Sequence, residues 1–195
     1  MAAETKNRIF GLEALLKAEA GRGRPPVERW NPPYCGDIGL AIGANGVWYY
    51  RGSPIGRPAL VKLFASVLRK DADGRHYLVT PAEKVDVAVK DAPFLAVEME
   101  VRGEGSAQEL IFRTNVDDIV AASPHHPLRF ELEAGSGGLK PYLAVRGRLE
   151  ALLTRAIVWD LAQLATAAVE TGAPLGLWSG GAFFALPAPA VEAAP

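Results

Sequence analysis

The sequence has one cysteine, almost no net charge and no long apolar run, and each of these absences excludes a class of protein. With Cys35 alone, no disulfide can form within the chain, which excludes a small disulfide-stabilised scaffold. The formal net charge is −1, from 21 Lys and Arg residues against 22 Asp and Glu residues, so no overall field attracts nucleic acid or an anionic membrane. Charged residues interrupt the apolar runs before the roughly 18–20 residues that a membrane-spanning helix needs.

What remains is typical of a globular protein, with 49% apolar and 22% charged residues. Residues 1–10 lack the apolar core of about 7–15 residues that a secretory signal contains. We therefore expect a cytoplasmic protein without a membrane span. The length of 195 residues allows one large domain or two small ones.

The two ends of the chain differ from the part between them. Residues 7–20 have apolar side chains at a helical spacing, which predicts a short N-terminal helix. Residues 21–26 form a basic link rich in glycine and proline, which cannot continue a helix. Residues 187–195 are rich in proline and alanine, and we expect a frayed tail there.

One order of elements occurs twice between these ends: a hairpin, an Arg-Gly pair, an amphipathic helix and a strand. In the first copy, Asn45-Gly46 between apolar runs is a strong signal for a hairpin turn, and Arg51-Gly52 ends the second strand. This copy contains, in order, strands at 38–42 and 47–51, a helix from about Pro58 and a strand at 76–80.

The second copy has the same order, and Arg146-Gly147 again ends a strand. It contains strands at 128–133 and 142–146, a helix over 149–164 and a strand within 174–186. Three further strands lie between the copies, at 85–89, 94–101 and 109–114. In the last two, polar residues such as Glu98, Glu100 and Arg113 alternate with apolar ones, which indicates that one face meets solvent.

These patterns predict an α+β protein of two associated parts that share the hairpin–helix–strand motif, with mainly antiparallel strands and two principal helices. The first part, 1–81, holds the N-terminal helix, the basic link and the first copy. The second part, 82–195, holds the remaining strands, the second copy and the tail. An alternative architecture for the second part is a helix-capped barrel of the pleckstrin-homology type, because residues 76–147 provide a run of strands before one long helix.

Several short motifs, in one order, resemble a known family. They are Cys35-Gly36-Asp37-Ile38-Gly39, Gly52-Ser53-Pro54-Ile55, the helix at 60–67, the segment 78–84 and His126-Pro127-Leu128-Arg129. Together they resemble the proteobacterial domain of unknown function 1285 family, over about Trp30 to Phe184. The resemblance implies a two-part α+β fold with repeated motifs and a role in signal transduction suggested from fold alone. It implies no catalytic residues.

Five residues around the start of the first helix form a candidate ligand-binding site: Arg51, Gly52, Ser53, Arg57 and Lys62. Backbone N–H groups at a helix start, together with basic side chains, bind phosphate or carboxylate groups. Because the helix dipole disfavours cations there, two bases without an acid require a counter-charge. That charge comes either from a bound anion or from a carboxylate of the protein, and an ordinary capped helix start remains the alternative.

A second candidate cluster combines Cys35, Asp37 and His126, which are residue types that bind metals or act in nucleophilic catalysis. The spacing is poor, because the adjacent His125 and His126 point to opposite sides of an extended segment. No second cysteine or H-x-x-x-H pattern accompanies them. We therefore expect no metal and no cofactor.

The residues favour a non-enzymatic binding or regulatory module for an anionic small molecule or a protein partner, because no catalytic constellation is complete. Two alternatives stay open. One is a small enzyme that uses Cys35 or His126 with Asp37. The other is a structural or assembly protein in which the paired halves create a surface for a homodimer.

Overall fold

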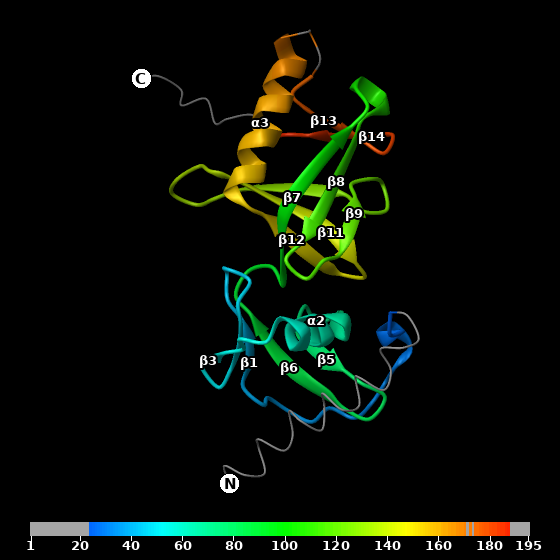
Figure 1. Ribbon diagram of the computed structural model, residues 1–195, viewed down its shortest axis with the longest axis vertical. Coiled ribbons are helices and arrows are strands. Elements are labelled where there is room, and N and C mark those ends of the chain that lie inside the picture. Colours follow the sequence, from blue (N-terminus) through cyan, green and yellow to red (C-terminus); the bar gives the residue numbers. More distant parts are fainter. Residues whose placement is uncertain (1–23, 171, 173, 188–195) are drawn as a thin grey trace. The chain divides into compact units, whose positions relative to one another are not determined.

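The computed structural model describes residues 24–170, 172 and 174–187 (Figure 1). The chain divides into an N-terminal unit, Met1–Asp91, and a C-terminal unit, Ala92–Pro195. This division lies beyond the boundary expected near Pro81, because strand β6 (Lys84–Val89) pairs with two strands of the N-terminal unit. The helix predicted at 7–20 and the tail at 188–195 fall outside the described residues.

A six-stranded sheet forms the N-terminal unit, in the order β3-β2-β1-β6-β5-β4. Its other strands are β1 (Leu40–Ile42), β2 (Trp48–Tyr50), β3 (Ser53–Pro54), β4 (Leu68–Lys70) and β5 (His76–Val79). Helix α2 (Pro58–Ser66) connects β3 to β4, and the short 3-10 helix η2 (Val27–Arg29) precedes β1. Neighbouring strands are antiparallel except β1 and β6, which are parallel.

The β1–β2 hairpin forms where the sequence predicts it. Gly46 adopts a φ of 73°, and Asn45 Oδ1 accepts a hydrogen bond of 3.2 Å from the backbone N–H of Val47. Helix α2 then packs on this sheet, and its fully buried Phe64 lies 6.1 Å from Trp48 between ring centroids. The helix begins at Pro58, as expected, because the fixed φ of proline suits the first helical turn.

The apolar spacing of this helix continues to Leu68 in the sequence, but α2 ends at Ser66 and Leu68 begins strand β4. This strand pairs antiparallel with β5, where Lys70 lies opposite His76. Burial and the nearby Lys70 charge lower the pKa of His76 to about 4. The imidazole Nε2 is buried and has no hydrogen-bond partner among the described residues.

A second six-stranded sheet forms most of the C-terminal unit, in the order β10-β11-β12-β7-β8-β9, and it curves into a half-barrel. Its strands are β7 (Phe94–Arg102), β8 (Glu109–Thr114), β9 (Ile119–Ala121), β10 (Leu128–Leu132), β11 (Leu139–Arg146) and β12 (Leu149–Leu153). The short 3-10 helix η3 (Gly105–Ala107) connects β7 to β8. Neighbouring strands are antiparallel except β12 and β7, which are parallel.

The prediction that the second helix begins near Leu149 is wrong. Residues 149–153 form β12, in which Leu149, Ala151 and Leu153 are buried and the residues between them are half-buried. Helix α3 (Arg155–Glu170) follows and buries Ile157, Leu161 and Ala165. The apolar residues at 149–153 fit a helical spacing as well as a strand, and pairing with β7, far away in the sequence, makes them a strand.

Residues 174–186 contain a hairpin where a single strand was predicted. Strands β13 (Gly176–Ser179) and β14 (Ala182–Ala185) are joined by Gly180 and Gly181, both with positive φ. Each copy of the repeat therefore contains a hairpin, an Arg-Gly turn, a third strand, a helix and a second hairpin. The predicted α+β class, with two principal helices and mostly antiparallel strands in two parts, is confirmed.

Within the described parts of the chain, no helix is both long enough and apolar enough to cross a bilayer.

Replacing Leu153 by alanine will lower the free energy of unfolding by about 2–5 kcal/mol, because the side chain is 3% exposed and its loss leaves a cavity. Leu175→Ala is the matched control, since Leu175 is 38% exposed, and it will cost less than about 1 kcal/mol. Urea unfolding measures both. Equal costs would contradict the assignment of Leu153 to the inner face of β12.

Lowering the pH from 6.5 to about 4 will destabilise the protein partly through His76. In this range the unfolded state binds a proton that the folded state does not, so the unfolding free energy falls as pH falls. A His76→Gln variant lacks this proton uptake, and its unfolding midpoint in urea will fall less steeply over the same range. Parallel pH profiles for the two proteins would show that His76 titrates normally in the fold.

Candidate functional site

The candidate ligand-binding site at residues 51–62, called the basic loop from here on, lies on the surface of the N-terminal unit. Arg51 and Gly52 form the two-residue turn between β2 and β3, with φ values of 48° and 80°. The Arg51 guanidinium lies over the Tyr50 ring, 5.5 Å from its centroid. Arg57 precedes α2 as its N-cap residue without a capping hydrogen bond from its side chain, and the first turn of α2 contains no acid. All five predicted residues, Arg51, Gly52, Ser53, Arg57 and Lys62, are exposed.

The structure brings the Cys35–Gly39 motif against this loop. The Gly39 carbonyl accepts a 2.7 Å hydrogen bond from the Arg51 N–H, and Asp37 Oδ1 accepts one of 2.7 Å from the Gly39 N–H. Gly39 has a φ of +84°, and a Cβ there would lie 2.9 Å from Cγ of Arg51. The Cys35 thiol donates to the Pro33 carbonyl over 3.5 Å. The Cys35–Gly39 motif and the basic loop, which are separate in the sequence, are therefore adjacent in the fold.

A cavity of about 420 Å³ lies beside this motif, lined by Asp37, by Gly74, Arg75 and His76, and by Asp86–Val89 of β6. Arg75 Nη2 lies 2.5 Å from Asp86 Oδ1, and the Tyr34 hydroxyl donates to the other oxygen of Asp86. The Arg75 guanidinium also lies over the rings of Tyr34 and Tyr77. Because these charged groups are occupied with one another, they tie the segment before β1 to the β5–β6 hairpin.

The second predicted cluster is divided between the two units. Cys35 and Asp37 belong to the N-terminal unit, whereas His126 belongs to the C-terminal unit. There, His126 Nδ1 lies 3.1 Å from the carbonyl oxygen of Ala144. Among the described residues, no group of three or more His, Cys, Asp and Glu side chains is arranged to hold a metal ion.

The C-terminal unit contains a larger groove, and its origin lies in the register of β11. The Ala144 N–H bonds to the Pro127 carbonyl on the β10 side, so the odd-numbered residues of β11 face β12. Extending the β11–β12 register places Pro141 opposite Leu153, where proline has no N–H to donate. The β11–β12 pairing ends at Tyr142 and Leu152, and the β10–β11 hairpin continues beyond it alone.

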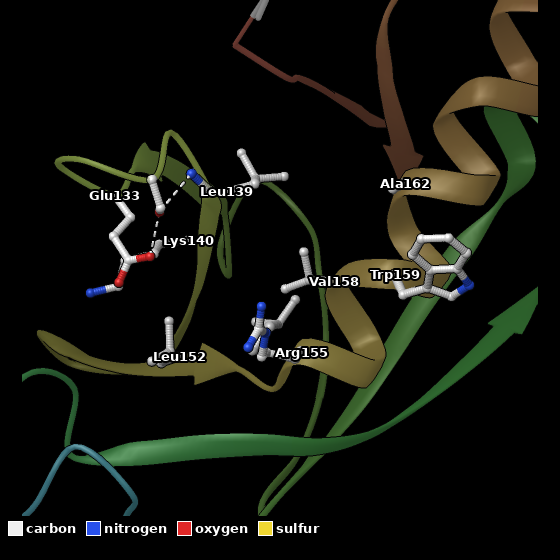
Figure 2. A pocket seen from close by; sticks show the side chains of 11 residues that line it. Glu133, Leu139, Lys140, Leu152, Arg155, Val158, Trp159 and Ala162 are labelled. Atoms are coloured by element: carbon white, nitrogen blue, oxygen red, sulfur yellow. Dashed lines mark hydrogen bonds between the residues drawn. The ribbon is translucent and has the colours of Figure 1, made fainter.

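The groove, of about 620 Å³, lies between the free end of this hairpin and the first turns of α3 (Figure 2). Most of its lining is apolar and comes from three elements: Leu139 of β11, Leu152 and Leu153 of β12, and Val158, Trp159 and Ala162 of α3. In Figure 2 the hairpin residues lie on one side, the α3 residues on the other and Leu152 below them. This volume is within the range of ~300–1,000 Å³ that is usual for small-molecule sites.

Three charged side chains also line this groove: Glu133, Lys140 and Arg155. Glu133 accepts a 2.6 Å hydrogen bond from the Ser136 hydroxyl within the hairpin turn. Arg155 is exposed and forms no ion pair with any described residue, and the first turn of α3 contains no acid. The groove therefore combines an apolar floor with a cation at the positive end of a helix dipole.

The sequence does not predict this groove, because the apolar spacing at 149–153 also fits a helix, on which Leu152 and Leu153 were expected. One signal was present in Trp159, which is two residues from the buried Ile157 and therefore on the opposite side of α3. Trp159 is 67% exposed. A tryptophan on the solvent side of an amphipathic helix marks a contact surface more often than a core position.

Comparisons with known proteins agree with this two-unit architecture. The model for "Domain of unknown function (DUF1285), N-terminal domain" matches residues 25–92, and that for "Protein of unknown function (DUF1285), C-terminal domain" matches residues 93–186. The two family models meet within two residues of the junction between the units. No curated protein sequence matches the chain.

Two crystal structures are similar to this chain. A DUF1285 family protein from Silicibacter pomeroyi DSS-3 is 43% identical, with a TM-score of 0.77 over 88% of this chain and 93% of the other. A DUF1285 family protein from Shewanella baltica OS155 is 29% identical, with a TM-score of 0.52 over 65% of this chain and 92% of the other. The resemblance seen in the short motifs is thus confirmed, and the chain belongs to the DUF1285 family.

Proposed function

We propose that the protein is a non-enzymatic binding or regulatory module, and that the groove beside α3 binds a small molecule with an apolar body and one anionic group. The observation that carries this proposal is the exposed Trp159 across an apolar groove from Leu139. Burying such a side chain against a ligand removes apolar surface from water, at about 25 cal/mol per Å².

The charge of the groove supports an anionic rather than a neutral ligand. Lys140 and Arg155 provide two positive charges against the single negative charge of Glu133. The Arg155 guanidinium has no ion pair with a described residue, and a ligand carboxylate or phosphate would supply one. The same group would face the positive end of the α3 dipole, which adds a favourable interaction of about 0.3–1 kcal/mol.

The basic loop of the N-terminal unit is the second place where we propose an anion to bind. It differs from the groove in being an exposed loop, in which the Arg51 guanidinium lies over the Tyr50 ring. The absence of an acid from the first turn of α2, with Arg57 immediately before it, supports an inorganic or phosphorylated anion there.

Decanoate, a probe with an apolar chain and one carboxylate, will bind the wild-type protein in isothermal titration more tightly than decanol does. Trp159→Ala will weaken both probes, because the groove loses its largest apolar side chain. Arg155→Gln will weaken decanoate about three- to tenfold and leave decanol unchanged, since only the charged contact is lost. Arg148→Gln is the matched control, because Arg148 is exposed but does not line the groove. Identical decanoate binding by the two arginine variants would refute the charged contact.

Millimolar sulfate will raise the melting temperature of the wild-type protein through the basic loop, because an anion that binds only the folded state stabilises it. The double change Arg57→Ala, Lys62→Ala will remove this response. The double change Lys90→Ala, Arg148→Ala removes the same charge from exposed positions outside the loop and will retain it. If the two double variants respond alike, the loop does not bind anions.

A further inference from the structure

Strand β10 is the longest open edge in either six-stranded sheet. The four edge strands are β3 with two residues, β4 and β9 with three each, and β10 with five. Folded proteins keep edges short or otherwise blocked, because unpaired backbone groups recruit further strands. Because β3, β4 and β9 have only two or three residues, they offer few unpaired backbone groups to another strand, whereas β10 offers more.

The hydrogen-bond pattern shows which groups of β10 are open. The Glu133 N–H bonds to the Gly138 carbonyl at 2.7 Å, and the Ala144 N–H bonds to the Pro127 carbonyl at 3.0 Å. Odd-numbered residues of this strand therefore face β11. The N–H and C=O groups of Leu128, Phe130 and Leu132 point to the open edge, and no hydrogen bond from another described residue reaches them.

The sequence of β10, Leu-Arg-Phe-Glu-Leu, is complementary to itself when read in the opposite direction. We propose that β10 pairs antiparallel with β10 of a second copy of this chain, about a twofold axis at Phe130. In this register Leu128 lies opposite the partner's Leu132, and Phe130 lies opposite the partner's Phe130. All of these residues point their backbone groups outward, so both strands are bonded along their full length.

The same register joins opposite charges across the axis. Arg129 lies opposite the partner's Glu131, and Glu131 lies opposite the partner's Arg129. Within one chain, Arg129 donates two 3.0 Å hydrogen bonds to Glu150 and one to Glu131, so the contacts across the axis extend an ion-pair network that each chain already contains. Opposite charges directly across an antiparallel pair are stabilising, and like charges are destabilising.

The inner face of β10 supplies apolar contact for the same pairing. Leu132 is 46% exposed, and Phe130 is half-buried, although both lie on the face that carries the buried Leu128. A twofold pairing places these side chains next to their counterparts and joins two six-stranded sheets into one. The surface is isologous, so the assembly closes at two copies. This inference does not rest on ligand binding in the groove.

The test is the molar mass of the full chain in solution, by sedimentation equilibrium from about 1 µM to about 1 mM. The wild-type mass will rise with concentration from the monomer value of 20.8 kDa towards twice that value. Glu131→Arg places like charges opposite each other and will be monomeric over the same range. Glu109→Arg makes the same change at an exposed position on β8, which is not an edge strand, and will dimerise like the wild type.

Mixing two charge-reversal variants distinguishes dimerisation through β10 from dimerisation through any other surface. Arg129→Glu alone will also be monomeric, but an equimolar mixture of Arg129→Glu and Glu131→Arg restores both opposite-charge pairs and will form a heterodimer. Leu132→Pro removes one outward N–H without touching the bonds to β11, and it will weaken the dimer with little change in melting temperature. The proposal is overturned if the wild type stays monomeric, if Glu131→Arg dimerises normally, or if the mixture does not dimerise.

Discussion

The C-terminal unit depends on how far β12 can follow β11, and Pro141 sets that limit. Proline is rare inside a sheet because it cannot donate to the neighbouring strand. Here it lies one residue beyond the last β11–β12 pair, Tyr142 with Leu152, while Leu153 at the end of β12 pairs only with β7 and α3 begins at Arg155. The β10–β11 hairpin continues without a neighbour on that side. The groove beside α3 is the space that this difference in strand length leaves.

The repeat explains the architecture of both units but not the role of its matching residues. In both copies a third strand follows the Arg-Gly pair, and each sheet contains one parallel pair, β1 with β6 or β12 with β7. The two arginines nevertheless differ. Arg51 is exposed in a turn, whereas Arg146 is largely buried, pairs with Asp118 and lies over the Phe94 ring. The same motif is therefore a surface feature in one copy and part of the internal packing in the other.

Local signals in the sequence were enough for the β1–β2 and β10–β11 hairpins and for most strands, but not for the β13–β14 hairpin. Asn45-Gly46 fixed the first turn, and strand β8 has the bounds that alternation predicted, because each depends on neighbours in sequence. The segment 149–153 was misassigned because its apolar residues satisfy both a helical and a strand spacing. Its partner β7 lies more than fifty residues earlier in the sequence. A local hydrophobic pattern cannot predict a parallel pairing between segments that far apart.

The two candidate sites differ in the same way, because one depends on residues close in sequence and the other on segments far apart. The basic loop was visible in the sequence because Arg51, Arg57 and Lys62 are close along one stretch of chain. The groove was not, because its lining comes from a hairpin, a strand end and a helix whose meeting depends on the register at Pro141. One hairpin supplies both the groove wall, at Leu139, and the open edge, at Phe130. The edge is open because β10 is the last strand of its sheet, and the groove exists because β11 continues beyond β12. Both features carry apolar side chains that are not fully buried, Phe130 and Leu132 at the edge and Leu139 in the groove.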